Sequence, residues 1–181
     1  MRILVKKGGP LTTLQDLGRY GYQKFGVLVS GAMDDVSLRL SNLLVQNDPG
    51  EGALEMTMSG PVLVLPAGLV FALTGADMKA TLGGKPVPRY RPIYVRKEAI
   101  LTFGFAQTGS RAYLSVAGGF DVPQVMESKS TYLRAKIGGV KGRPIDKGDE
   151  LPIGTIGPHQ AAFVGRMERS AKEGDSFVTV P

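Results

Sequence analysis

The residues in this sequence that could do chemistry are arginines, carboxylates and hydroxyls placed on glycine-rich loops. Arg19 and Arg111 could each hold a carboxylate or phosphate, because the guanidinium group presents a planar fork of N–H donors. Asp16, Asp34 and Glu55 could orient these arginines or accept substrate protons. Together these groups predict a site for a small anionic molecule.

Further hydroxyl donors follow one another along a single loop. They are Ser128, Ser130, Thr131 and Tyr132. Each candidate also has a structural alternative: Arg19 could pair with Asp16 to lock its loop, Asp34 could only cap a helix, and the hydroxyls could satisfy turn backbone. It is the joint placement of these residues on a few loops that favours a site.

The sequence lacks the signatures of several common kinds of site. It has no cysteine and a single histidine, His159, so thiolate chemistry is excluded and we predict no metal site. Neither a Walker-type phosphate loop nor a dinucleotide-binding glycine motif is present. The formal net charge is +6, but the basic residues are scattered and no aromatic residues interleave them, so we expect no nucleic acid partner.

The elements that must position these side chains are mostly strands. Short apolar runs end at turns rich in glycine and proline. We predict strands at 2–5, 53–58, 62–65, 69–74, 78–82 with 86–87 as a tight hairpin, 93–95, 100–105, 111–116, 150–153 and 177–181. Many short strands without alternating helices favour a barrel or sandwich over a βαβ sheet, in one domain over residues 1–181.

One main helix is predicted, at about residues 33–46, as the plug or side wall of this β-architecture. Its apolar positions form the stripe typical of an amphipathic helix. They are Met33, Val36, Leu40, Leu43 and Leu44. Ser30 or Asp34 could cap its first turn. After the strands, residues 121–149 are predicted to be a polar loop.

No segment is suited to a membrane or to secretion. The longest apolar stretch, residues 62–76, is interrupted by Pro66 and Gly68, and only a short apolar run precedes the first lysines. The absence of cysteine is compatible with a reducing compartment. We therefore predict a cytoplasmic protein without a membrane partner.

Ordered sequence blocks resemble one known family, the allophanate hydrolase subunit 2 family, which is also called the KipI antagonist (KipA) family and includes the C subunit of 5-oxoprolinase. The resemblance extends from about Leu11 to Pro152. The blocks are Gln15–Arg19 with Gly21, Gly26-Val27, Ser30–Asp34, Asn42–Val45 with Asn47, Leu54-Glu55, Ser59–Pro61, Thr74–Asp77, Gly109–Leu114, Ala117–Gly119, Ser130–Tyr132 and Gly148-Asp149. Glu127 and Lys129 stand where the family pattern has a glycine and an arginine. Lysine keeps the charge but loses the guanidinium fork.

This resemblance implies a mainly β, cyclophilin-like β-barrel that is the N-terminal half of a two-barrel protein. It also implies a partner, the homologous subunit 1 or KipI-like protein. Relatives belong to biotin-dependent urea carboxylase, act in ATP-dependent 5-oxoprolinase, or relieve inhibition of a sporulation histidine kinase. ATP would act through the complex, and biotin would need a separate carrier domain.

On this basis we expect a non-autonomous subunit of an ATP-dependent 5-oxoprolinase, which opens pyroglutamate to glutamate. The alternatives are a non-catalytic KipI antagonist and the carboxyltransferase part of a urea carboxylase or allophanate hydrolase system. The substrate is expected to be a small carboxylate or amide. The expected catalytic residues are Asp34, Glu55, Arg111 and Tyr132, and the expected substrate-binding residues are Gln15, Asp16, Arg19, Ser30, Ser128, Ser130 and Thr131.

Overall fold

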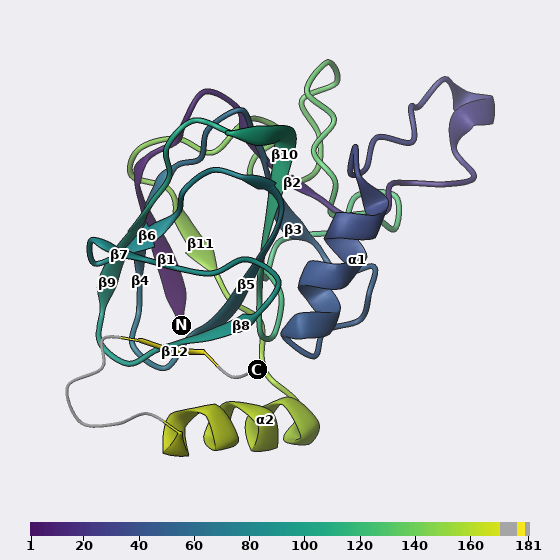
Figure 1. Cartoon of the computed structure of the whole chain (residues 1–181). Helices are drawn as coiled ribbons and strands as arrows, with labels where there is room; N and C mark the ends of the chain where they lie inside the picture. Colours follow the sequence, from purple (N-terminus) through teal and green to yellow (C-terminus); the bar gives the residue numbers. More distant parts are fainter. Residues whose placement is uncertain (171–176, 180–181) are drawn as a thin grey trace.

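The computed structural model describes residues 1–170 and 177–179, and these residues form a mainly β fold, as the sequence predicted. Two six-stranded antiparallel sheets face one another around a common core (Figure 1). The first sheet has the order β11 (Glu150–Pro152), β1 (Arg2–Lys7), β4 (Val62–Leu65), β9 (Ala99–Thr102), β6 (Thr81–Leu82) and β7 (Lys85–Pro86). The second has the order β12 (Phe177–Thr179), β8 (Pro92–Val95), β5 (Val70–Asp77), β10 (Thr108–Val116), β3 (Ala53–Thr57) and β2 (Thr12–Gln15).

The core lies between the two sheets and is built from aliphatic and aromatic side chains. Strands with one face in solvent alternate in burial; β4, for example, buries every second residue. The central strands β5 and β10 are buried on both faces over much of their length, because a helix covers their outer face. This helix is α1 (Asp35–Leu44), which lies beside β3, β5 and β10 in Figure 1.

Helix α1 forms the predicted side wall. However, the face that it packs against the sheet is opposite to its apolar stripe. Four of the five stripe residues are exposed: Met33 by 73%, Val36 by 61%, Leu40 by 42% and Leu43 by 50%. The face on the sheet consists of Ser37, Leu38, Ser41 and Asn42.

Hydrogen bonds explain why a polar helix face packs inward. The hydroxyl of Thr74 on β5 donates to the Ser37 carbonyl at 2.7 Å, and the hydroxyls of Ser41 and Ser115 lie 2.7 Å apart. The side-chain amide of Asn42 donates to the Glu51 carbonyl at 2.7 Å. Polar groups that form hydrogen bonds are tolerated in a buried interface. These bonds therefore determine which face of α1 packs on the sheet, and the spacing of apolar residues in the sequence does not predict it.

A second helix, α2 (Pro158–Arg169), was not predicted from the sequence. Proline at its first position is compatible with helix initiation, and Phe163 and Met167 pack against Tyr94 and Val70. Strand β12 then pairs with β8, in the predicted place; Val180 and Pro181, the last two residues of the predicted strand, lie outside the described residues. Neither α1 nor α2 is long and apolar enough to cross a bilayer.

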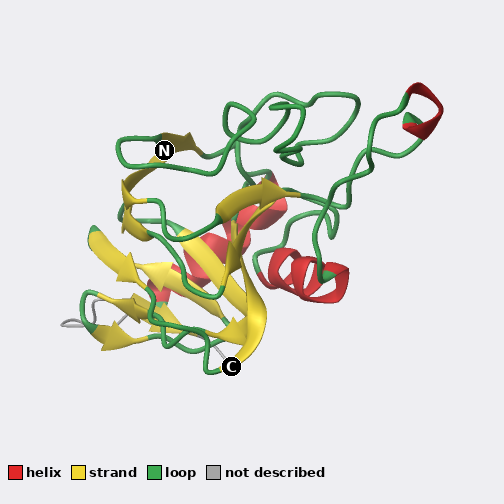
Figure 2. Cartoon of the chain, turned by 90° about the horizontal axis from the view of Figure 1, so that it is seen from above, coloured by secondary structure: helices red, strands yellow, loops and turns green. Residues whose placement is uncertain are grey.

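The loops gather on one side of the molecule in Figure 2. Residues 121–149 contain no strand longer than an isolated bridge, as predicted, and an ion pair fixes the end of this loop. There Arg143 donates from both terminal nitrogens to the two Asp149 oxygens, each at 2.7 Å. A second long loop carries the short 3₁₀-helix η1 (Gln23–Phe25) and extends away from the sheets in both views. Strand β2, which pairs with β3, was not among the predicted strands.

Candidate functional site

A polar pocket of about 570 Å³ opens where the first turn of α1 faces the ends of β5 and β10. Three of the residues that line it are Asp34, which precedes α1, Arg89, which precedes β8, and Arg111 on β10. Tyr90 and Ser110 line it too. Two expected catalytic residues, Asp34 and Arg111, therefore share one cavity.

Behind this pocket, Glu55 on β3 is the centre of a group of hydrogen bonds that we call the Glu55 cluster: Met33, Asp34, Glu55, Arg111 and Tyr113. The Tyr113 hydroxyl donates to Glu55 Oε2 at 2.7 Å, and the Met33 backbone N–H donates to the same oxygen at 2.8 Å. The backbone N–H of Asp34 donates to the Tyr113 hydroxyl at 2.8 Å. The cluster thus fixes the entry to α1 against the sheet.

Tyr113 contributes a neutral donor to this cluster. Its side chain has no exposed surface, and burial, followed by the hydrogen bond and negative charge of Glu55, raises the pKa of the Tyr113 phenol far above its usual value. The phenol therefore stays neutral near neutral pH. It orients Glu55 but cannot act as a proton acceptor.

The two pocket arginines retain donors for a ligand. Arg111 Nε lies 3.6 Å from Glu55 Oε1, which is too far for a hydrogen bond, and this buried nitrogen has no other partner among the described residues. Arg89 donates from Nη1 to the Gly75 carbonyl at 2.5 Å and lies over the Tyr90 ring. No described carboxylate forms an ion pair with Arg89.

The Asp34 carboxylate has a structural role, as the sequence allowed. Its two oxygens accept from the backbone N–H and the hydroxyl of Ser37 at 2.9 and 2.6 Å, which caps the first turn of α1. Asp34 therefore lines the pocket, but both of its carboxylate oxygens already accept hydrogen bonds from Ser37. Its negative charge also interacts favourably with the positive end of the helix dipole.

The expected substrate-binding residues form a separate group, the Asp16 network: Asp16, Arg19, Ser128, Lys129 and Ser130. Asp16 Oδ1 accepts from the Gly18 backbone at 2.7 Å, from the Ser128 hydroxyl at 2.8 Å and from the Ser130 hydroxyl. Asp16 Oδ2 accepts from the Lys129 backbone at 2.5 Å. The carboxylate is 8% exposed, so the protein's own donors surround it.

Arg19 is fully buried in this network and donates to the carbonyls of Ser130 and Val125. Burial lowers the pKa of Arg19, and the nearby Asp16 charge opposes that shift. Its Nη1 atom has no hydrogen-bond partner among the described residues. The structure thus places Arg19 and Arg111, predicted to act together, in different groups.

Backbone hydrogen bonds connect the two groups. The Asp16 carbonyl accepts from the Ala32 N–H at 2.9 Å, next to Met33 of the Glu55 cluster, and Arg19 N–H donates to the Val29 carbonyl at 2.8 Å. The Asp16 network therefore holds the loop that delivers Met33 and Asp34 to the pocket.

The remaining expected residues occupy neither the pocket nor the centre of a group. Gln15 donates to the Thr13 hydroxyl and the Thr131 carbonyl, while the Thr131 hydroxyl donates to the Leu14 carbonyl. Tyr132 forms a backbone bridge with Ile137 in the long loop. Ser30 has a positive φ of 59° in the turn before α1.

Sequence reasoning missed two residues of the pocket region, Arg89 and Tyr113. Tyr113 lies two positions after Arg111 on β10, so both point to the same side of the strand, and it pairs directly across from Glu55. That alternation was visible in the sequence, but the pairing with β3 was not. Arg89 was treated as one of many scattered surface charges.

The described residues contain no group of three or more histidine, cysteine, aspartate or glutamate side chains that could hold a metal ion. The pocket itself offers guanidinium donors beside a carboxylate–phenol pair. Such an arrangement can bind and orient a small anion.

Comparison with known proteins gives a consistent picture. The family described as carboxyltransferase domain, subdomain A and B, matches residues 25–179. The chain is 43% identical to the C subunit of Escherichia coli 5-oxoprolinase over 148 residues, which is 82% of this chain and 48% of that protein. It is 41% identical to urea amidolyase of Saccharomyces cerevisiae over 144 residues, 79% of this chain and 8% of that protein.

Solved structures agree. The crystal structure of Kluyveromyces lactis urea carboxylase superposes with a TM-score of 0.82 at 38% identity, covering 88% of this chain and 14% of that one. The chain thus spans just under half the length of the 5-oxoprolinase relative and a small part of the larger enzymes.

Proposed function

Because the chain belongs to the carboxyltransferase domain family, subdomain A and B, we propose that it is a non-autonomous part of an ATP-dependent 5-oxoprolinase-type enzyme. In this proposal it is one barrel-like unit of a two-barrel protein, works in the cytoplasm with a KipI-like homologous subunit, and takes part in opening pyroglutamate to glutamate. The 5-oxoprolinase relatives of Escherichia coli and Haemophilus influenzae support this choice.

The observation that carries the proposal is the pair of guanidinium groups in the polar pocket. Arg111 lies 3.6 Å from Glu55 without a hydrogen bond to it, Arg89 donates to a backbone carbonyl, and pyroglutamate carries one carboxylate that could accept from both. We assign the binding of that carboxylate to Arg111, with Arg89 beside it and Glu55 fixing the orientation of Arg111 from behind. Asp34 and the Asp16 network then hold the pocket wall in place.

We assign ATP to another subunit of the complex. The sequence has no Walker-type motif, and the pocket has guanidinium groups but no glycine-rich turn leading into a helix. When bound elsewhere in the complex, ATP supplies the free energy for hydrolysing the stable lactam amide. The residues of this chain orient the substrate by its carboxylate.

Two alternatives keep specific support. A KipI antagonist without catalytic activity would use a protein-binding surface, and the exposed apolar stripe of α1 is suited to one. The carboxyltransferase part of a urea carboxylase system is supported by the yeast relatives, and would need a biotin carrier in another domain or chain.

The test is pyroglutamate-dependent ATP hydrolysis by the chain reconstituted with its KipI-like and ATP-binding partner subunits. Arg111→Ala should lower kcat/KM for pyroglutamate roughly 10- to 100-fold, because a charge-assisted interaction with the substrate is lost. Arg39→Ala is the matched control, since Arg39 is half exposed and its ion pair among the described residues is with Asp35, on the surface of α1 at 3.6 Å.

Unchanged turnover in Arg111→Ala would remove the assignment of the substrate carboxylate to this residue. Binding to the partner without any pyroglutamate-dependent ATP hydrolysis would favour the antagonist instead. ATP-dependent carboxylation of urea, with a biotin carrier present, would favour the urea carboxylase alternative.

A further inference from the structure

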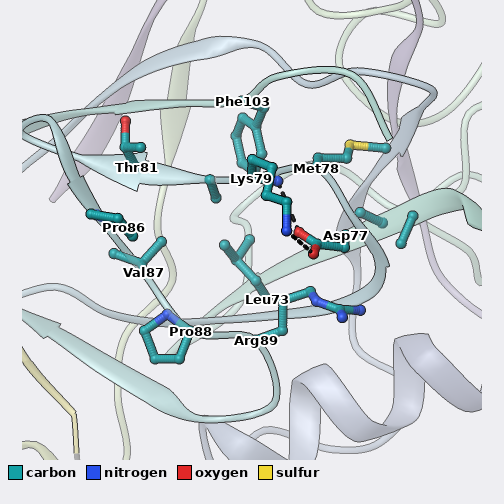
Figure 3. A pocket seen from close by; sticks show the side chains of 13 residues that line it. Leu73, Asp77, Met78, Lys79, Thr81, Pro86, Val87, Pro88, Arg89 and Phe103 are labelled. Atoms are coloured by element: carbon teal, nitrogen blue, oxygen red, sulfur yellow. Dashed lines mark hydrogen bonds and ion pairs between the residues drawn. The ribbon is translucent and has the colours of Figure 1, made fainter. Parts of the chain in front are cut away.

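A second cavity, of about 360 Å³, lies next to the polar pocket and differs from it in chemistry. Most of its lining is apolar: Leu73 and Met78 are 2% exposed, Val87 is 9% exposed, and Phe103 packs against the same core. Figure 3 shows Phe103 and Met78 on one side of this cavity and Val87 on another, with Leu73 between them. We call it the apolar pocket.

The charged groups at the rim of the apolar pocket differ in whether they form an ion pair. Asp77 accepts from the Lys79 backbone at 3.0 Å and from Lys79 Nζ at 2.8 Å, and these bonds lower the pKa of Asp77. The two opposite charges therefore satisfy each other. Arg89 is the remaining cation of the rim. Its charge also helps to lower the pKa of Asp77, but no carboxylate of the described residues forms an ion pair with it.

Arg89 is also shared between the two cavities, since Arg89 and Ala76 line both. In Figure 3 its guanidinium group extends away from Pro88 and Leu73, toward the side on which the α1 ribbon lies. An anion on this group would therefore sit at the passage between the cavities. An apolar group attached to that anion by a short linker could reach the apolar pocket.

The rim is preformed by its backbone. Lys79 and Tyr90, at the two ends of the segment that forms much of the lining, have positive φ angles of 48° and 58°, which L-residues rarely adopt. Between them Val87 N–H donates to the Ala80 carbonyl at 3.1 Å. Just before Lys79, the Met78 carbonyl accepts from the Gly104 N–H at 2.7 Å. A cavity of this volume and lining, with one polar anchor, matches the usual character of small-molecule sites.

We propose that the apolar pocket is a second ligand site, which takes a monocarboxylate with a compact apolar ring: the ring in the pocket and the carboxylate, on a short linker, bound to Arg89. This site goes beyond the proposed function, because pyroglutamate has a polar lactam ring and uses Arg111 in that proposal. Since Arg89 lines both cavities, a ligand held there reduces the binding of small carboxylates in the polar pocket.

The first test compares three probes that separate ring from charge, by calorimetry on the full chain. They are 3-phenylpropionate, the uncharged 3-phenylpropanol with the same ring, and propionate with the same charge and no ring. We expect 3-phenylpropionate to bind at least about tenfold more tightly than either of the other two. Equal affinity of the acid and the alcohol would overturn the role of Arg89, and equal affinity of the acid and propionate would overturn the role of the apolar pocket.

The second test uses variants with a matched control. Arg89→Gln should weaken 3-phenylpropionate about tenfold, whereas Arg91→Gln, which removes the same charge from an exposed residue two positions away, should leave it unchanged. Ala80→Leu should abolish the advantage of the ring by filling the apolar pocket. Equal effects of the Arg89 and Arg91 variants would contradict the proposal.

Thermal unfolding of each variant checks that it is folded. If Ala80→Leu does not fold, the probe series and the arginine pair still decide the outcome. Neither result depends on turnover: failure of 3-phenylpropionate to bind would remove the second site while leaving the Arg111 test of the proposed function intact.

Discussion

The Asp16 network makes the most direct prediction about what holds the functional loops together. Replacing Asp16 with alanine removes the acceptor for two backbone N–H groups, those of Gly18 and Lys129, and for two serine hydroxyls. The hydroxyls can turn to other acceptors, but the two N–H groups cannot. The buried guanidinium of Arg19 also loses its nearby negative charge.

The magnitude follows from these losses. An unsatisfied buried donor costs about 1–3 kcal/mol, so two N–H groups and the change around Arg19 give a loss of about 4 kcal/mol in the free energy of unfolding. That is a large fraction of the 5–15 kcal/mol typical of a domain. For a chain of this size it corresponds to a decrease of about 12 °C in Tm.

The assay is thermal and urea unfolding at neutral pH, followed by circular dichroism. Asp35→Ala is the control, because Asp35 is exposed and its interaction with Arg39 is a surface ion pair at 3.6 Å; it should cost less than about 1 kcal/mol. If Asp16→Ala is as stable as this control, the carboxylate does not order the loop. It would then be free for a ligand, as the substrate-binding expectation requires.

Three further perturbations test other parts of the fold. Leu38→Ala should lower the free energy of unfolding by about 2–5 kcal/mol in urea titrations, whereas Leu40→Ala, on the exposed stripe of α1, should change it by less than about 1 kcal/mol; equal losses would contradict the orientation of the helix. Tyr113→Phe should cost about 1–3 kcal/mol by the same assay, since Glu55 loses a donor, and a neutral result would show that this hydrogen bond contributes nothing. The lowered pKa of Asp149 means that its contribution to stability is present above its ordinary pKa of 3.8 and is lost as the pH falls further. Asp149→Asn should therefore unfold more readily at pH 7 and depend less on pH in acid than the parent chain, and parallel Tm profiles of the two would refute this.

The sequence predicted the fold class because turns and alternating strands are local signals. Strands such as β4 fall within the predicted bounds, and so does the start of α1 at Asp35, directly after the capping carboxylate of Asp34. The inward face of α1 was not predictable, because it depends on hydrogen bonds to Thr74 and Ser115 on strands far along the chain. Helix α2 was missed because only Phe163 and Met167 mark its buried face.

The candidate site was predictable in kind but not in arrangement. Residue types placed Asp34, Glu55 and Arg111 among the expected catalytic residues, and the structure brings these together. They also grouped Arg19 with Arg111, whereas Arg19 lies buried in the Asp16 network. Which arginine reaches a cavity depends on strand pairing and burial, which a single sequence does not reveal.

The Asp16 network also has a consequence for synthesis of the chain. Asp16 and Ser130 are separated by 114 positions, so the N-terminal loop cannot complete its bonds until the later segment has left the ribosome. At the usual 5–20 residues per second that interval is about 6–23 s. During this time the arginine that ends fully buried must remain hydrated, and the loop stays accessible to proteases and chaperones.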